Sequence, residues 1–130
     1  MRGRMRKFAT AGAVAATVIL AAPLVASAGD RDVERSGSCG RSSDWKLKVG
    51  PEDGRLEVEF EVDQDRVGDR WRVRIRHDGQ LAFAGRRTTH GPSGSFEVRI
   101  VEPNRAGADA FRGMATNLRT GETCVGTVSF

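Results

Sequence analysis

The sequence contains few of the residues that catalytic and metal sites usually need. Its 130 residues include two histidines and two cysteines, and the cysteines are not arranged as a Cys-x-x-Cys pair. No set of three or four ligand-type residues has the spacing of a metal site, and no glycine-rich phosphate loop follows a strand pattern. Residues 63–69 begin like a calcium-binding loop, but Val67 and Arg74 stand where oxygen ligands are needed. We therefore expect no catalytic residue, no metal site and no cofactor, and predict that the protein is not an enzyme.

Long apolar runs are missing after residue 25, and the one run before it has the features of an export signal. Residues 1–7 include four basic residues and no acidic one, and residues 8–25 form a continuous apolar stretch that contains Pro23. Small residues follow at 26–28 (Ala-Ser-Ala). This order predicts a secretory signal peptide at residues 1–28 and a secreted, extracellular protein. A retained membrane anchor is the alternative, because the stretch is just long enough to span a bilayer.

An excess of positive charge is also missing from the chain that remains after cleavage. The sequence has 21 basic and 17 acidic residues, and four of the basic ones lie within the first seven positions. The predicted mature chain therefore has equal numbers of both. A neutral chain gives no reason to expect nucleic-acid binding, and no membrane association is expected after cleavage.

The two cysteines, Cys39 and Cys124, lie near opposite ends of the predicted mature chain. Export delivers them to an oxidising compartment, where two cysteines pair readily. The sequence therefore predicts a Cys39–Cys124 disulfide that staples a small domain with limited core burial.

Period-two alternation of apolar and polar residues dominates the sequence from Cys39 onward, and helical periodicity is absent. Turn residues separate the alternating runs, and Asp78-Gly79 is a strong signal for a tight hairpin. About eight strands at this spacing predict an all-β antiparallel sandwich or small barrel at residues 39–130. Residues 29–38 are polar and poor in apolar residues, so we expect a flexible leader there.

Two consecutive predicted strands carry opposite charges at their polar positions. The first presents Glu57, Glu59 and Glu61, followed by Asp63, and the second presents Arg70, Arg72, Arg74 and Arg76. A hairpin through residues 64–69 would place the acids opposite the arginines and neutralise this sheet face. If the two strands lie in different sheets instead, the arginine row is free to bind acidic polymers.

The segment at residues 109–122 resembles the last hairpin of immunoglobulin-like domains. The matching positions are Phe111, Gly113, Ala115, Asn117 and Gly121, and Trp71 resembles the core tryptophan of the same superfamily. The resemblance implies an immunoglobulin-like β-sandwich. It lacks the tyrosine-corner hydroxyl at Phe111, and Gly113 stands where these domains carry a cysteine. The whole chain also resembles small exported proteins of actinomycetes, a likeness that implies a class and no mechanism.

Together these features favour a non-catalytic extracellular module that recognises a protein or a glycan. Exposed loops at the ends of a sandwich are the expected contact regions. The predicted loops are residues 50–54, 64–69, 89–94 and 103–109. The alternative is a secreted protease inhibitor that presents residues 101–107 to a protease, with Arg105 as the specificity residue.

Overall fold

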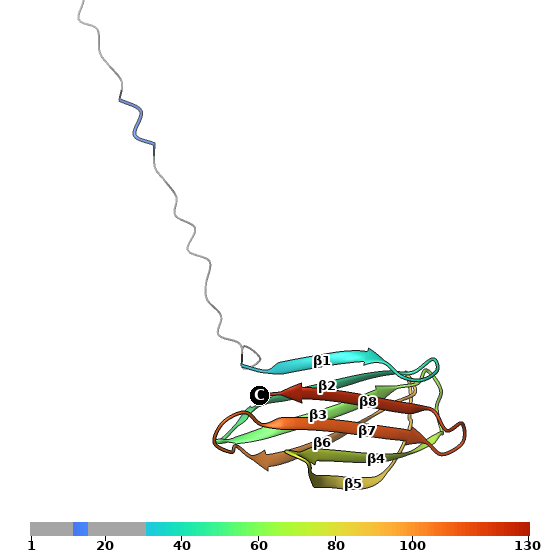
Figure 1. The fold of residues 1–130 in the computed structure, drawn as a ribbon. Helices are drawn as coiled ribbons and strands as arrows, with labels where there is room; N and C mark the ends of the chain where they lie inside the picture. Colours follow the sequence, from blue (N-terminus) through green and yellow to red (C-terminus); the bar gives the residue numbers. More distant parts are fainter. Residues whose placement is uncertain (1–11, 16–30) are drawn as a thin grey trace, which may run out of the picture.

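Eight antiparallel strands form two four-stranded sheets in the computed structural model, which describes residues 12–15 and 31–130 (Figure 1). The predicted signal peptide lies almost entirely outside these residues. Within the described part of the chain, no helix is long and apolar enough to cross a membrane. The strands are β1 (Val33–Ser38), β2 (Asp44–Glu52), β3 (Arg55–Asp63), β4 (Arg70–His77), β5 (Gln80–Thr88), β6 (Ser95–Pro103), β7 (Ala110–Asn117) and β8 (Thr123–Ser129).

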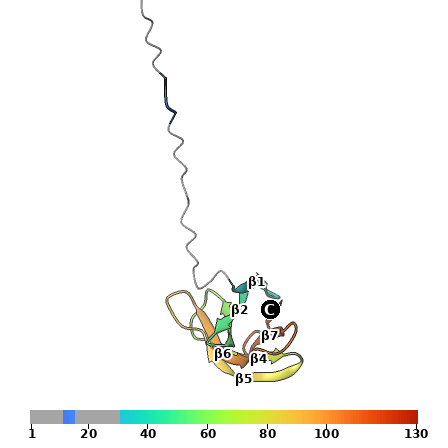
Figure 2. The same cartoon turned by 90° about the vertical axis from the view of Figure 1, so that its left-hand side faces the viewer.

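The first sheet has the order β1-β2-β3-β6, and the second has the order β5-β4-β7-β8. Figure 2 shows the two layers from the end, with β2 and β6 on one side and β4 and β7 on the other. The chain crosses between the sheets after β3, β5 and β6. The prediction of an antiparallel sandwich is therefore confirmed, and the barrel alternative is wrong.

Period-two alternation places one face of each strand in the core between the sheets. In β3 the buried residues are Leu56, Val58, Phe60 and Val62, and in β4 they are Trp71, Val73, Ile75 and His77. All eight side chains have no exposed surface. Seven of them are apolar, and burial of such apolar area is the main favourable contribution to folding.

Residues with special backbone or packing requirements form one tight turn and two close contacts between the sheets. Asp78 and Gly79 both have positive φ (48° and 80°) and form the predicted tight turn between β4 and β5. Gly113 of β7 faces the ring of Phe60 across the core, and a Cβ there would lie 2.9 Å from the ring. Gly126 of β8 lies against the indole of Trp45 in the same manner.

The predicted flexible leader at residues 29–38 is wrong for its second half. Residues Val33–Ser38 form strand β1, which pairs with β2 from Val33↔Val49 to Ser38↔Asp44. The segment has little apolar content because it is an edge strand, stabilised mainly by backbone hydrogen bonds to β2. The sandwich therefore begins at Val33 and not at Cys39.

The predicted pairing of the acidic strand with the arginine strand is also wrong. β3 pairs with β2 and β6, whereas β4 pairs with β5 and β7 in the other sheet. The apolar faces of β3 and β4 pack in the same core, so their charged faces point to opposite sides of the sandwich. The acids and the arginines are therefore separated by the whole thickness of the domain.

Candidate functional site

The outer face of the sheet β5-β4-β7-β8 carries the densest concentration of positive charge in the described structure. β4 supplies four exposed arginines at alternate positions, β5 adds one and β7 adds one. We name this set the arginine face: Arg70, Arg72, Arg74, Arg76, Arg86 and Arg112. Strand geometry spaces alternate side chains by about 6.7 Å along a strand and neighbouring strands by about 4.8 Å. The β4 row therefore extends over roughly 20 Å of the sheet.

No ion pair joins the arginine face to a carboxylate of residues 31–130. The sheet register even places like charges opposite each other, because Arg72 pairs with Arg86 and Arg76 pairs with Arg112. Directly opposed like charges destabilise a sheet by a few tenths of a kcal/mol to about 1 kcal/mol per pair. The fold therefore maintains this face at a cost in stability.

The outer face of the other sheet is acidic and largely self-paired. Lys48 forms a 2.9 Å ion pair with Glu59, and Arg99 contacts Glu57 directly. The hydrogen bond from Arg99 holds the pKa of Glu57 below its usual value. Burial, together with nearby Glu59 and Glu61, raises the pKa of Glu97. Of the acidic residues singled out in the sequence, Glu57 and Glu59 therefore pair within their own sheet, and none of them forms an ion pair with the arginine face.

A buried polar cluster around Asp69 closes one end of the sandwich. Arg119 donates to both carboxylate oxygens of Asp69 at 2.7–3.1 Å, and Asn117 and Gln64 donate at 3.0 and 2.6 Å. The hydrogen bond from Arg119 is the largest cause that holds the pKa of Asp69 far below its usual range. Gln64 also accepts a 3.0 Å hydrogen bond from the indole nitrogen of Trp71. These interactions give the cluster a structural role, fixing the crossing from β3 to β4.

A second buried cluster surrounds His77 at the opposite end. The ring of His77 stacks on Phe111 with centroids 4.3 Å apart. Its Nε2 lies 2.6 Å from Asp109 and 3.5 Å from Asp78, and its Nδ1 lies 3.2 Å from Glu102. The ligand-type atoms of His77, Asp78 and Asp109 lie within 4.8 Å of one another, a convergence that the sequence spacing did not indicate. The direct hydrogen bond between His77 and Asp109 links the end of β4 to the segment before β7, so this buried polar cluster joins the β4–β5 and β6–β7 turns.

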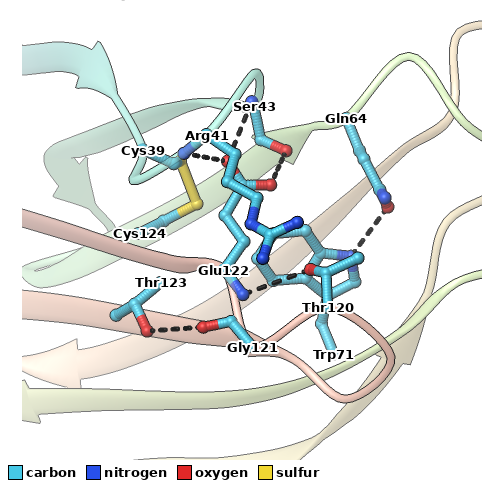
Figure 3. The surroundings of a disulfide bond; sticks show 10 residues. All are labelled: Cys39, Arg41, Ser43, Gln64, Trp71, Thr120, Gly121, Glu122, Thr123 and Cys124. Atoms are coloured by element: carbon cyan, nitrogen blue, oxygen red, sulfur yellow. Dashed lines mark hydrogen bonds between the residues drawn. A yellow bond between two sulfur atoms is a disulfide. The ribbon is translucent and has the colours of Figure 1, made fainter.

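The predicted disulfide joins Cys39, just after β1, to Cys124 in β8, and so connects the two sheets (Figure 3). Beside it, the buried carboxylate of Glu122 accepts hydrogen bonds from the backbone of Arg41 and from the backbone and hydroxyl of Ser43. Burial alone would raise the pKa of Glu122, but the hydrogen bonds hold it below its usual value. The bridge indicates that the protein folds in an oxidising compartment.

A groove of about 630 Å³ opens at the edge where β1 approaches β8. Three arginines line it: Arg35 from β1, and Arg76 and Arg112 from the arginine face. Trp45, Phe111 and Val128 supply its apolar lining, and no acidic residue lines it. No sequence pattern indicated that Arg35 would line this groove, because its position there depends on how β1 lies beside β8.

The four predicted contact loops divide between the two ends of the sandwich. Residues 64–69 and 89–94 lie together, as the 3.0 Å hydrogen bond from the amide of Gln64 to the carbonyl of Gly94 shows. Residues 50–54 and 103–109 lie at the other end, since Arg55 pairs with Pro103. Arg105 is placed 3.6 Å from Asp78 and donates to Gln80 at 3.3 Å. Its guanidinium is therefore held against the domain in this conformation.

No protein-family model matches the chain, and neither the curated proteins nor the solved structures that were compared with it contain a significant match. The functional argument therefore depends on the geometry of the chain itself.

Proposed function

We propose that the protein is a secreted, non-catalytic binding module that recognises acidic polysaccharides through the arginine face. The observation that carries this proposal is that none of the six arginines forms an ion pair with a carboxylate of residues 31–130, whereas Lys48 and Arg99 on the opposite face do. Guanidinium groups form bidentate, charge-assisted hydrogen bonds with carboxylate and sulfate groups. A flat, regularly spaced array of such groups suits a linear polyanion better than a compact ligand.

The unfavourable placement of like charges supports the same conclusion. Arg72 lies opposite Arg86, and Arg76 lies opposite Arg112, so each pair raises the free energy of the unbound protein. An anionic polymer laid across the sheet would neutralise both pairs at once. Binding would therefore relieve this repulsion.

The predicted secretion supports the choice of an extracellular polymer as the ligand. The proposal takes residues 1–28 as a cleaved signal peptide, in agreement with the order of basic, apolar and small residues. The Cys39–Cys124 bridge is consistent with an oxidising extracellular location.

We further infer that the sandwich is immunoglobulin-like. Trp71 lies in the core on a central strand of one sheet, and β7 and β8 form the hairpin that resembles the last one of these domains. Immunoglobulin domains join their sheets by a central disulfide. Here Gly113 faces Phe60 across the core, so an aromatic ring occupies the space beside the missing cysteine.

The test measures binding of the protein, purified after expression of the full chain, to heparin and to polygalacturonate, with neutral dextran as the control polymer. We expect binding to both acidic polymers that weakens as salt concentration rises, and none to dextran. The variant Arg72→Thr/Arg74→Thr removes two charges from the arginine face. The matched control Lys46→Thr/Arg55→Thr removes two charges from the outer face of the other sheet.

We expect the arginine-face variant to lose affinity by about tenfold or more, because each arginine makes charge-assisted contacts. The control variant should stay within about threefold of the original protein, since only long-range attraction changes. Equal losses in the two variants would show that net charge alone determines binding and would contradict the proposal. Failure to bind either acidic polymer, or tighter binding to duplex DNA, would also contradict it.

A further inference from the structure

The groove between β1 and β8 lies at one end of the arginine face, and the two features share Arg76 and Arg112. Arg35 reaches the groove from the other sheet, since β1 belongs to the order β1-β2-β3-β6. Arg35 pairs with Leu47 in register, so it lies on the core side of the edge strand and still remains exposed. Arginines from three strands therefore line one recess.

The lining of this groove combines positive charge with apolar surface. Trp45 is half-buried, with its indole against Gly37 and Gly126, and Phe111 and Val128 form buried apolar surface next to it. Ser36 and Thr127 also line the groove and add hydroxyl groups. Ligand sites commonly combine a concave apolar surface with a few convergent polar groups, within a volume of about 300–1,000 Å³. The 630 Å³ groove lies within that range.

We propose that this groove is a subsite for one acidic sugar residue at the end of the polymer, with its carboxylate or sulfate between Arg35, Arg76 and Arg112. This inference rests on the proposed function. It adds the place where the end of the polymer binds and the direction in which the polymer runs along the sheet. A sugar ring offers apolar C–H surface to Trp45 and hydroxyl groups to Ser36 and Thr127, while its acidic group meets the guanidinium groups. The rest of the polymer then continues from the groove along the arginine face.

The two tryptophans provide a built-in reporter of where a short ligand binds. Trp45 lines the groove, whereas Trp71 is fully buried and donates its indole hydrogen to Gln64 at the other end of the domain. We would titrate the protein with trigalacturonate and follow both indole N–H signals by NMR, with neutral maltotriose as the control. The signal of Trp45 should shift in a saturable manner, and that of Trp71 should stay in place.

Variants separate the groove from the arginine face. Arg35 lines the groove and is not part of the arginine face, whereas Arg74 belongs to the arginine face and does not line the groove. Arg35→Thr should weaken trigalacturonate binding by about tenfold, through the loss of a charge-assisted contact. Arg74→Thr should leave it within about twofold. An unchanged Trp71 signal in each variant shows that the fold is intact.

The outcomes distinguish this proposal from the proposed function. If trigalacturonate leaves Trp45 unmoved, or if Arg35→Thr binds it as tightly as the original protein, the subsite is wrong. Polymer binding that still depends on Arg72 and Arg74 would then leave the proposed function intact. Loss of both trigalacturonate binding and polymer binding in the original protein would overturn both proposals.

Discussion

The disulfide should supply a large part of the stability of the domain. We consider the double variant Cys39→Ala/Cys124→Ala, which removes a bridge between residues separated by 85 positions in the sequence. The chain-entropy relation for a loop of that length gives about 4.6 kcal/mol at 25 °C. Small domains have free energies of unfolding of about 5–15 kcal/mol. Loss of the bridge should therefore remove from about a third to nearly all of the stability.

The assay is urea denaturation followed by tryptophan fluorescence, with the oxidised protein and the double variant compared in the same buffer. Cys124 is fully buried, so alanine there also removes some packing. Reduced original protein serves as the matched control, because it keeps both sulfur atoms and lacks only the bridge. We expect the double variant and the reduced original protein to unfold at a much lower urea concentration than the oxidised protein.

A difference in free energy of unfolding below about 1 kcal/mol between the oxidised and reduced protein would refute the reasoning. It would mean that the denatured chain is already compact across the 85-residue separation, so that closing the loop removes little entropy.

Three further predictions follow from other parts of the structure. Arg72→Thr should increase the free energy of unfolding by a few tenths of a kcal/mol to about 1 kcal/mol, because it removes the repulsion with Arg86. Thermal unfolding at low salt measures this change, and a clear loss of stability would contradict the prediction. The pKa of Asp69 is lowered in the folded protein, so its carboxylate contributes stability that is fully present above about pH 4. This stability is lost as pH falls, because Asp69 is protonated in the unfolded chain at a higher pH than in the folded one. Asp69→Asn should therefore make the free energy of unfolding less dependent on pH below 4, and an unchanged slope would show that the carboxylate does not act in this way. Gly126→Ala should destabilise the domain by about 1–3 kcal/mol and shift the Trp45 indole NMR signal, because the new methyl group would clash with the indole. Unchanged stability and an unchanged Trp45 signal would show that β8 moves to accommodate the methyl group.

Most of the strands could be predicted because alternation reports directly which side of a strand is buried. The turn at Asp78-Gly79 and the Cys39–Cys124 bridge were also predictable, the first from residues that tolerate positive φ and the second from a single available pairing. Alternation does not report which strands are neighbours. The opposite charges of β3 and β4 suggested a hairpin, but packing of both apolar faces into one core places these strands in different sheets.

The parts that could not be predicted depend on residues that meet only after folding. His77 contacts Glu102 and Asp109, which lie 25 and 32 positions away, and no local pattern relates them. The groove is lined by both Arg35 of β1 and Arg112 of β7, which come together only in the folded domain. Strand β1 itself was not predicted, because backbone pairing with β2 stabilises a strand that has little apolar content. Edge strands of this kind leave a weak trace in the sequence.

Separation of the charges onto two faces gives the domain an electric dipole, although residues 29–130 contain 17 basic and 17 acidic side chains. An electric field exerts little net force on a molecule of zero net charge, but it exerts a torque on the dipole that orients the molecule. Near a negatively charged surface the domain therefore rotates so that β4 faces the surface before any contact forms. The carboxylates of β3 then point away from the surface.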